Sequence, residues 1–98
     1  MAKGYWVTAY QSVSDPEKLA EYGKLAGPAI EAAGGRFLIR GGQVTAHEAG
    51  KTERTVVVEF DSYAQAVAAY QSEPYQRALA VLDGAVVRDL RIVEGVDR

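Results

Sequence analysis

Four runs of aromatic and β-branched residues, separated by turn-forming segments, predict four β-strands. They cover residues 4–10, 36–40, 54–60 and 86–93. Such side chains fit a pleated and half-buried surface. Gly41-Gly42 predicts a bulge after the second run, so we expect residues 43–48 to continue as an extended segment, to turn at residues 49–52 and to form a hairpin with the third run.

The segment between the first two strands has apolar residues at every third or fourth position, which predicts a helix. It begins at Ser14-Asp15-Pro16-Glu17, where a capping side chain, a first-turn proline and an acid follow one another, and it ends at Gly34-Gly35. Proline lacks the N–H that would bond to Lys24, so we expect a kink or a break at Gly27-Pro28.

A second helical pattern follows the third strand. Asp61-Ser62 with Gln65 offers a start, and Ser72-Glu73-Pro74 breaks and restarts the helix before it ends at Gly84. The resulting order, β-α-β-β-α-β, is typical of a ferredoxin-like α+β fold with a four-stranded antiparallel sheet and helices on one face. We expect one domain over residues 1–95 and a polar tail at residues 96–98.

Strand residues of alternating parity point to opposite faces of the sheet, which divides them into two sets. One set is apolar and predicts the floor beneath the helices: Val7, Ala9, Phe37, Ile39, Val56, Val58, Phe60, Leu90 and Ile92. The other set mixes apolar and charged residues: Trp6, Thr8, Tyr10, Arg36, Leu38, Arg40, Thr55, Val57, Glu59, Asp89, Arg91 and Val93. Neither a solvated face nor a sealed core collects such a mixture, so we expect this open face to pair with a second copy of the chain around a partly polar cavity.

The composition narrows the partners and the compartment. Acidic and basic residues are interspersed and sum to a net charge of -2, so no basic stripe is present for nucleic acid. The chain has no cysteine, which excludes disulfides and thiolate chemistry and is compatible with a reducing cytoplasm. No apolar run reaches the roughly eighteen residues that span a bilayer, so we expect a cytoplasmic protein without membrane contact.

Sequence motifs for the common cofactors and metals are absent. The one histidine, His47, lies near the end of the extended segment, whereas a metal site needs several converging ligands. No P-loop, GxGxxG or GxSxG pattern occurs. We therefore expect no cofactor and no metal, and we interpret His47 as a surface residue.

Short segments spread along the chain carry a resemblance to a known family. They are Gly4-Tyr5-Trp6, Asp15-Pro16, Tyr22, the run from Gly34 to Gly42, Glu59-Phe60, Tyr70-Gln71-Ser72, Tyr75-Gln76 and the run from Ile92 to Gly95. In this combination the sequence resembles the family called domain of unknown function 1330. The resemblance implies a dimeric α+β barrel and no particular reaction, because that superfamily includes cofactor-free monooxygenases, haem-degrading enzymes and muconolactone-isomerase-like proteins.

The candidate site consists of polar and aromatic residues of the open face. Arg40 offers a guanidinium for a carboxylate or an enolate, and Glu59 accepts a proton if burial raises its pKa, so we predict these two as catalytic. The residues predicted to bind the ligand are Trp6, Tyr10, Asp89 and Arg91. An ion-pair network across the dimer interface explains the same charges equally well.

Tyr22, Ser72 and Tyr75 are assigned to packing and helix capping and stay outside this site. The function that these patterns favour is a homodimer that binds a small organic carboxylate, carbonyl or phenolic compound, with cofactor-free monooxygenase- or isomerase-like chemistry. The expected cavity lies either between sheet and helices or between the two sheets of the dimer. The alternative is a noncatalytic dimeric module that acts through partner proteins. A cavity that reaches Arg40 and Glu59 favours the first, and a face filled by paired side chains favours the second.

Overall fold

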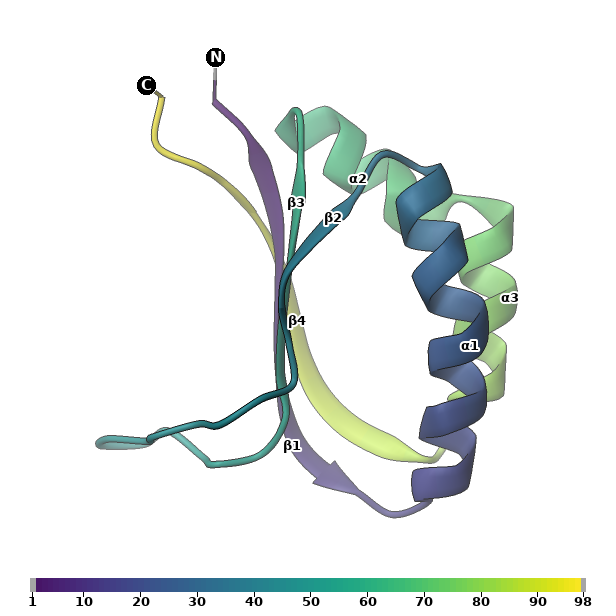
Figure 1. The fold of residues 1–98 in the computed structure, drawn as a ribbon, viewed down its shortest axis with the longest axis vertical. Coiled ribbons are helices and arrows are strands. Elements are labelled where there is room, and N and C mark those ends of the chain that lie inside the picture. The colour runs from purple at the N-terminus through teal and green to yellow at the C-terminus, as the bar shows by residue number, and fades with distance from the viewer. Residues whose placement is uncertain (1, 98) are drawn as a thin grey trace.

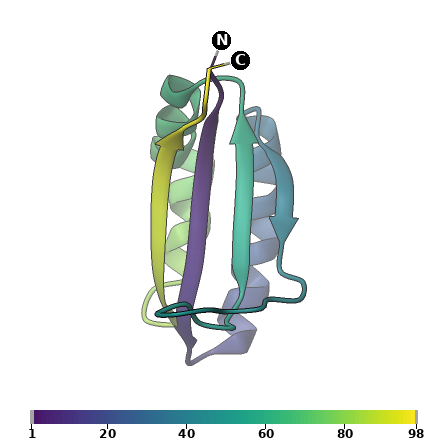
Figure 2. The same cartoon turned by 90° about the vertical axis from the view of Figure 1, so that its left-hand side faces the viewer.

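The computed structural model of the chain describes residues 2–97. Its elements are β1 (Gly4–Val13), α1 (Pro16–Ala32), β2 (Arg36–Arg40), β3 (Thr55–Phe60), α2 (Tyr63–Gln71), α3 (Glu73–Val81) and β4 (Val86–Glu94). The strands form one antiparallel sheet in the order β2-β3-β1-β4, and all three helices cover the same face of it (Figure 1; Figure 2). The predicted ferredoxin-like α+β fold is confirmed, with its second helix divided into α2 and α3.

Helix α1 begins and ends near the predicted residues. The Asp15 carboxylate accepts a hydrogen bond from the Lys18 N–H at 3.1 Å, so Asp15 is the cap, while the Ser14 hydroxyl bonds to carbonyl oxygens at Gly84 and Ala85. Of the kink or break predicted at Gly27-Pro28, the break does not occur, because α1 continues to Ala32. Within residues 2–97, no helix combines the length and apolarity needed to cross a bilayer.

The boundary between α2 and α3 lies where the sequence predicts it. The Ser62 hydroxyl accepts a hydrogen bond from the Gln65 N–H at 3.1 Å and caps α2. Ser72 ends α2 in an extended conformation, and its hydroxyl donates to the carbonyl oxygen of Ala69 at 2.7 Å. Ser72 therefore has the structural role that its sequence context indicates.

The segment between β2 and β3 differs from the predicted hairpin. Strand β2 ends at Arg40, and Gly41 and Gly42 then have φ values of +76° and +98°, which turn the chain out of the sheet. Residues 43–48 form no strand; the segment projects beyond the sheet on the side away from the helices (Figure 1). His47 lies exposed near its tip, where the Gly50 N–H bonds to the His47 carbonyl oxygen.

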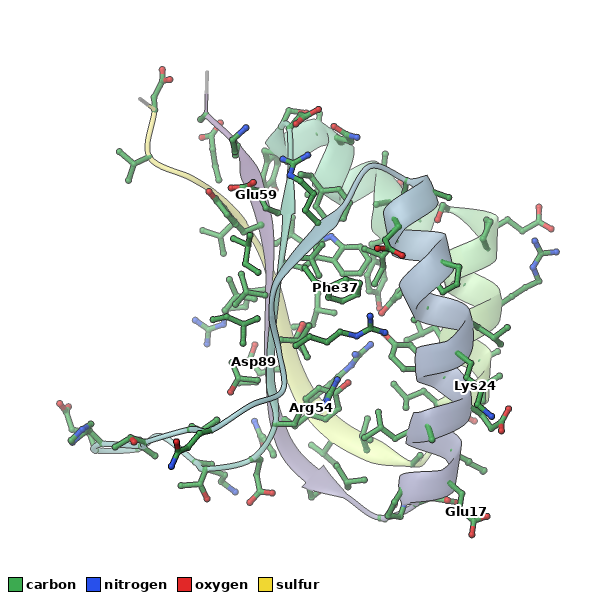
Figure 3. All side chains as sticks on the ribbon, in the orientation of Figure 1. Glu17, Lys24, Phe37, Arg54, Glu59 and Asp89 are labelled. Atoms are coloured by element: carbon green, nitrogen blue, oxygen red, sulfur yellow. The ribbon has the colours of Figure 1, made fainter. Side chains whose placement is uncertain are left out.

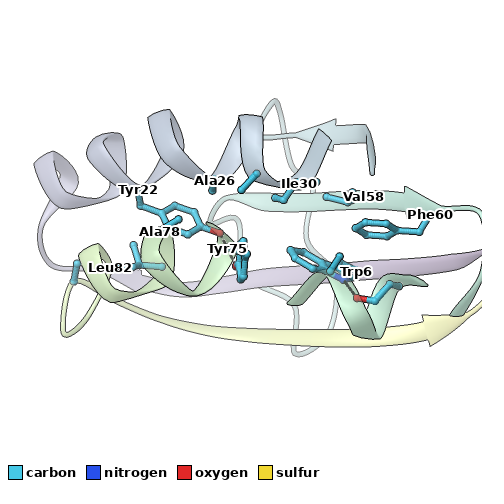
Figure 4. Packing of buried hydrophobic residues seen from close by; sticks show 13 residues of the cluster. Trp6, Tyr22, Ala26, Ile30, Val58, Phe60, Tyr75, Ala78 and Leu82 are labelled. Carbon is cyan, nitrogen blue, oxygen red and sulfur yellow. Dashed lines mark hydrogen bonds between the residues drawn. The ribbon is translucent and has the colours of Figure 1, made fainter. Parts of the chain in front are cut away.

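The core lies between the sheet and the helices and is built on aromatic side chains. Trp6, Phe60 and Tyr75 are almost completely buried, and the Trp6 ring lies 5.3 Å from that of Phe60 and 4.8 Å from that of Tyr75 (Figure 4). The Trp6 indole N–H donates to the carbonyl oxygen of Ala66 at 2.8 Å. This bond satisfies the one polar atom of the ring and ties β1 to α2.

In β1, and in β2 after Phe37, the side chains point to the face of the sheet opposite to the predicted one. Trp6 pairs with Val58 and Ile92, so the set Trp6, Thr8 and Tyr10 faces the helices, and Val7 is 37% exposed on the open face. In β2 an irregularity between Phe37 and Ile39 shifts the register. It moves Ile39 to the open face and places Arg40 opposite Val56, on the helix face.

Candidate functional site

A cavity of about 300 Å³ lies between α1 and the sheet. Its floor is formed by residues of the four strands and its roof by most of the length of α1. The lining residues are Trp6, Thr8, Tyr10, Pro16, Leu19, Ala20, Tyr22, Gly23, Ala26, Gly27, Ile30, Phe37, Arg40, Arg54, Val56, Val58, Tyr75, Arg88 and Leu90. None of them is acidic or a histidine, and three are arginines.

Small residues of α1 create the space. Ala20, Gly23 and Gly27 recur at helical spacing on the side of α1 that lines the cavity. Longer side chains at these positions would fill the volume and close the layer onto the sheet. The composition of one helix face thus accounts for a cavity where a domain of this size would normally have core.

One wall of the cavity is a cluster of a guanidinium and three phenols. Arg88 Nη1 donates to the hydroxyl oxygens of Tyr10 and Tyr22 at 3.2 and 3.3 Å, and Nη2 donates to that of Tyr75 at 3.0 Å. The hydroxyls of Tyr22 and Tyr75 are themselves hydrogen-bonded at 2.7 Å. These bonds join β1, α1, α3 and β4 around one positive charge, which we call the Arg88 cluster.

The Arg88 cluster contains no counterion. Within residues 2–97, no carboxylate forms an ion pair with Arg88. Burial acts to lower the pKa of Arg88, but the phenols of Tyr22 and Tyr75 act to raise it, and the net direction is upward, so the guanidinium stays charged. Burial also raises the pKa of Tyr75, which keeps this hydroxyl neutral and able to donate a hydrogen bond.

Two further arginines reach the cavity from the edge of the sheet opposite to β4. Arg40 ends β2, and its guanidinium lies 4.2 Å from the ring centre of Phe37 and against the backbone of α1 at Gly27. Arg54 precedes β3, and its side chain extends into the space between sheet and α1 (Figure 3). Neither arginine forms an ion pair within the part of the chain that the structure describes.

Thr8 adds a polar group to the floor. The residue is only 2% exposed and lies on β1 between Val56 and Leu90. Its hydroxyl has no hydrogen-bond partner among residues 2–97, although every fully enclosed side-chain polar atom there has one. The Thr8 hydroxyl is therefore open to the cavity and available to a ligand.

The structure divides the six predicted site residues between the two faces of the sheet. Trp6, Tyr10 and Arg40 line the cavity, whereas Glu59 and Asp89 point away from the helices (Figure 3). Arg91 lies beside Asp89 on that same open face. The prediction that all six lie together on the open face is wrong, because of the reversed parity of β1 and the irregularity in β2.

On the open face, the charged residues pair within the protomer. Arg36 binds Glu59 at 3.1 Å, and the Tyr5 hydroxyl donates to the other oxygen of Glu59 at 2.9 Å. The Tyr5 hydrogen bond, followed by Arg36, lowers the pKa of Glu59, which is the opposite of what a proton-accepting role at neutral pH requires. Arg91 forms two hydrogen bonds to Asp89 at 3.1 and 3.0 Å.

Arg88, at the centre of the site, is absent from the predicted site residues. It has the same parity in β4 as Leu90, which is predicted to lie in the core, so strand alternation alone places the Arg88 side chain beneath the helices. The assignment of Tyr22 and Tyr75 to packing is confirmed by their burial. Their hydroxyls nevertheless line the cavity, and this could not be read from either residue alone.

Comparison with known proteins gives a family and a fold. The family model described as "Domain of unknown function (DUF1330)" matches residues 3–96. None of the curated proteins matches the sequence.

Several solved structures have the same fold. A protein of unknown function from Rhodopseudomonas palustris is 20% identical, with a TM-score of 0.73 over 99% of this chain and 85% of that one. A proposed antibiotic biosynthesis monooxygenase from Caulobacter crescentus is 17% identical, with a TM-score of 0.60 over 98% and 91%. A dimeric ferredoxin-like protein of unknown function from Thermobifida fusca is 14% identical, with a TM-score of 0.54 over 97% and 92%.

Proposed function

The chain belongs to the family described as domain of unknown function DUF1330, which names no ligand, and we propose that it binds a small organic anion in the cavity between α1 and the sheet. One observation carries the proposal: Arg88 is a partly buried cation that binds three phenol oxygens and forms no ion pair with a carboxylate among residues 2–97. Taking a charge out of water costs several kcal/mol unless a partner compensates it. An anionic ligand supplies that partner.

The donors that remain free support this proposal. A guanidinium has five N–H groups, and the three phenols account for three bonds to Arg88. The Arg88 Nε forms no hydrogen bond within residues 2–97, and the Thr8 hydroxyl is also unused. A carboxylate accepts hydrogen bonds from such donors and is held by charge as well as geometry.

The remaining residues that line the cavity determine which uncharged part of a ligand fits there. Apolar and aromatic side chains surround the cavity, among them Leu19, Ile30 and Phe37. A volume of about 300 Å³ equals the liquid volume of about ten water molecules, which suits a compound of about ten heavy atoms. We therefore favour a carboxylate on a small apolar or aromatic body.

The cavity supports binding better than proton transfer. Donors and cations stabilise a carboxylate, an enolate or a phenolate, which agrees with the class of ligand that the sequence favours. The side chains that usually act as bases near neutral pH are histidine and carboxylates, and none lines the cavity. Structural likeness to a proposed monooxygenase extends to the fold, so we assign no oxygenase or isomerase step.

We further propose that the protein is a homodimer joined through the open face of the sheet. Val7, Ile39 and Val93 are 37%, 45% and 44% exposed on this face, which is more apolar surface than a solvated sheet usually carries. The ion pairs of this face are complete within one protomer, so the face suits an interface rather than a pocket. The Thermobifida fusca structure, described as dimeric, supports the proposal.

Isothermal titration calorimetry tests the binding proposal. Acetate, hexanoate, benzoate and salicylate are titrated into the wild type, with benzamide as the neutral counterpart of benzoate. We expect at least one anion to bind, with at least tenfold loss in Arg88→Gln and no loss in Arg77→Gln, which removes an exposed charge on α3.

A second variant, Thr8→Val, tests the proposal in case Arg88→Gln does not fold. Thr8→Val keeps the size of the side chain and removes a cavity donor, so we expect several-fold weaker binding with an unchanged circular dichroism spectrum. The proposal is overturned if no anion of the panel binds, or if benzamide binds as well as benzoate. It is also overturned if both variants bind like the wild type.

A further inference from the structure

The positive charge of the cavity exceeds what one carboxylate needs. Among residues 2–97, three arginines line it, and none of the thirteen acidic residues does. The chain as a whole is acidic, with a net charge of -2, so this concentration does not reflect an excess of basic residues. Like charges around one small volume repel each other, and a ligand with two negative charges relieves that repulsion.

The three arginines reach the cavity from opposite sides of its floor. Arg88 comes from β4, at one edge of the sheet, and Arg40 comes from β2, at the other edge. Strand β1 lies between them and contributes Thr8 and Tyr10. Adjacent strands are about 4.8 Å apart, so the backbones of β2 and β4 are separated by about 14 Å across the floor. Arg88 and Arg40 therefore enter the cavity from opposite edges of the sheet, and we call these two ends of the cavity its poles.

The second pole, formed by Arg40 and Arg54, lies at the exposed edge of the cavity, where Arg40 also contacts Phe37 and α1. The Arg40 guanidinium lies over the Phe37 ring, and a Cβ on Gly27 would be 2.9 Å from its Nη2. The glycine of α1 thus leaves room for the guanidinium at the edge of the cavity. Arg54 lies close to Gly41 at the same end of β2, and a Cβ there would be 2.7 Å from its Nη1.

We propose that the ligand is a small dicarboxylate, with one acid at the Arg88 cluster and the other at the pole of Arg40 and Arg54. This inference rests on the proposed anion site and specifies the chemical class of its ligand. The apolar lining between the poles, including Val56 and Leu90, fits a short aliphatic or aromatic spacer. With about ten heavy atoms in all, diacids of four to eight carbon atoms are the expected range.

Matched pairs of diacids and monoamides test the proposal by calorimetry. Succinate, glutarate, adipate and isophthalate are each compared with the monoamide of the same acid, which has the same number of heavy atoms and one charge fewer. We expect at least one diacid to bind ten or more times tighter than its monoamide. This advantage should disappear in Arg40→Gln or in Arg54→Gln, with the monoamide unaffected, and it should persist in Arg77→Gln.

The outcomes separate this inference from the proposed function. If monoanions bind and depend on Arg88, but every diacid binds no tighter than its monoamide, the anion site stands and the second pole is refuted. A diacid advantage that persists in both Arg40→Gln and Arg54→Gln also refutes it. If neither diacids nor monoanions bind the wild type, the proposed function fails together with the inference.

Discussion

At Arg88, three phenol oxygens occupy the places that a carboxylate usually takes beside a buried guanidinium. Phenols accept hydrogen bonds but carry no charge at neutral pH, so they orient the guanidinium without neutralising it. A carboxylate in the same place would pair with Arg88 and compete with any anion that enters. The choice of tyrosine is what leaves the positive charge available to a ligand.

The Tyr75 hydroxyl should therefore matter to stability. Tyr75→Phe removes the bonds to Tyr22 and Arg88 while keeping the ring, and we expect a loss of about 2 kcal/mol, or about 10 °C in Tm. Tyr70→Phe is the control, because the Tyr70 hydroxyl has no hydrogen bond among residues 2–97 although its ring also packs on Trp6. Urea unfolding of both variants measures the difference, and equal losses would contradict the role of the cluster.

Glu59 has a structural role that depends on pH. Its folded-state pKa is lowered, so its ionised form stabilises the fold at pH values above the pKa of the unfolded chain, and this contribution is lost as pH falls through the folded value. We expect Glu59→Gln to lower Tm slightly at pH 7 and to have a smaller effect at pH 3. Thermal unfolding at the two pH values tests this, and a difference that stays constant would contradict it.

Among the elements, α1 has the largest influence on the site, because its small residues leave the cavity open. Gly27→Ala replaces a poor helix former and should raise stability by up to about 1 kcal/mol, as should Gly23→Ala, whose Cβ would meet nothing within 4 Å. The two differ in their effect on Arg40, since only the Cβ at Gly27 would approach its guanidinium.

Gly27→Ala should consequently weaken dicarboxylate binding through Arg40. In the Arg40→Gln background the same substitution should have no effect on that affinity, which a double-mutant cycle by calorimetry measures. If Gly27→Ala weakens binding equally with and without Arg40, the added methyl acts by narrowing the cavity, and the positioning of Arg40 by Gly27 is refuted.

The order of the elements and the limits of the helices follow from the sequence because each helix end has a local signal. The cap at Asp15, the turn at Ser62 and the break at Ser72 all lie within a residue or two of the predicted positions. The orientation of β1 has no such signal, since Trp6 and Tyr10 on one side and Val7 and Ala9 on the other are both compatible with burial. Packing against α2, where the Trp6 N–H finds a partner, decides it.

The placement of Arg40 was unpredictable for a different reason. The irregularity that reverses parity in β2 lies at Leu38, inside an apolar run, whereas the visible glycines at residues 41 and 42 lie beyond the strand. Alternation from Arg36 therefore puts Arg40 on the wrong face. One register shift of this kind leaves the predicted fold correct but makes the predicted position of a site residue wrong.

On the scale of the whole molecule, the two faces of the sheet have separate tasks. The cavity lies between α1 and the sheet, and the open face carries the proposed dimer contact. We expect Val7→Asp combined with Val93→Asp to yield a folded monomer that still binds benzoate, because the substitutions place charge in the contact and leave the cavity intact.

Light scattering after size exclusion measures this dissociation. Val96→Asp serves as the control, because Val96 is 75% exposed and lies after the end of β4. A double variant that remains dimeric would contradict the proposed interface, and a monomer that loses benzoate binding would show that the cavity depends on the partner.

The central claim is that the space between α1 and the sheet is an anion site organised by Arg88. The most direct measurement is a crystal structure with 4-bromobenzoate, in which the anomalous scattering of bromine locates the compound. We expect bromine inside the cavity, with the carboxylate within hydrogen-bond distance of Arg88. Bromobenzoate bound only elsewhere, or bound in the cavity with its carboxylate turned away from Arg88, would refute the anion site.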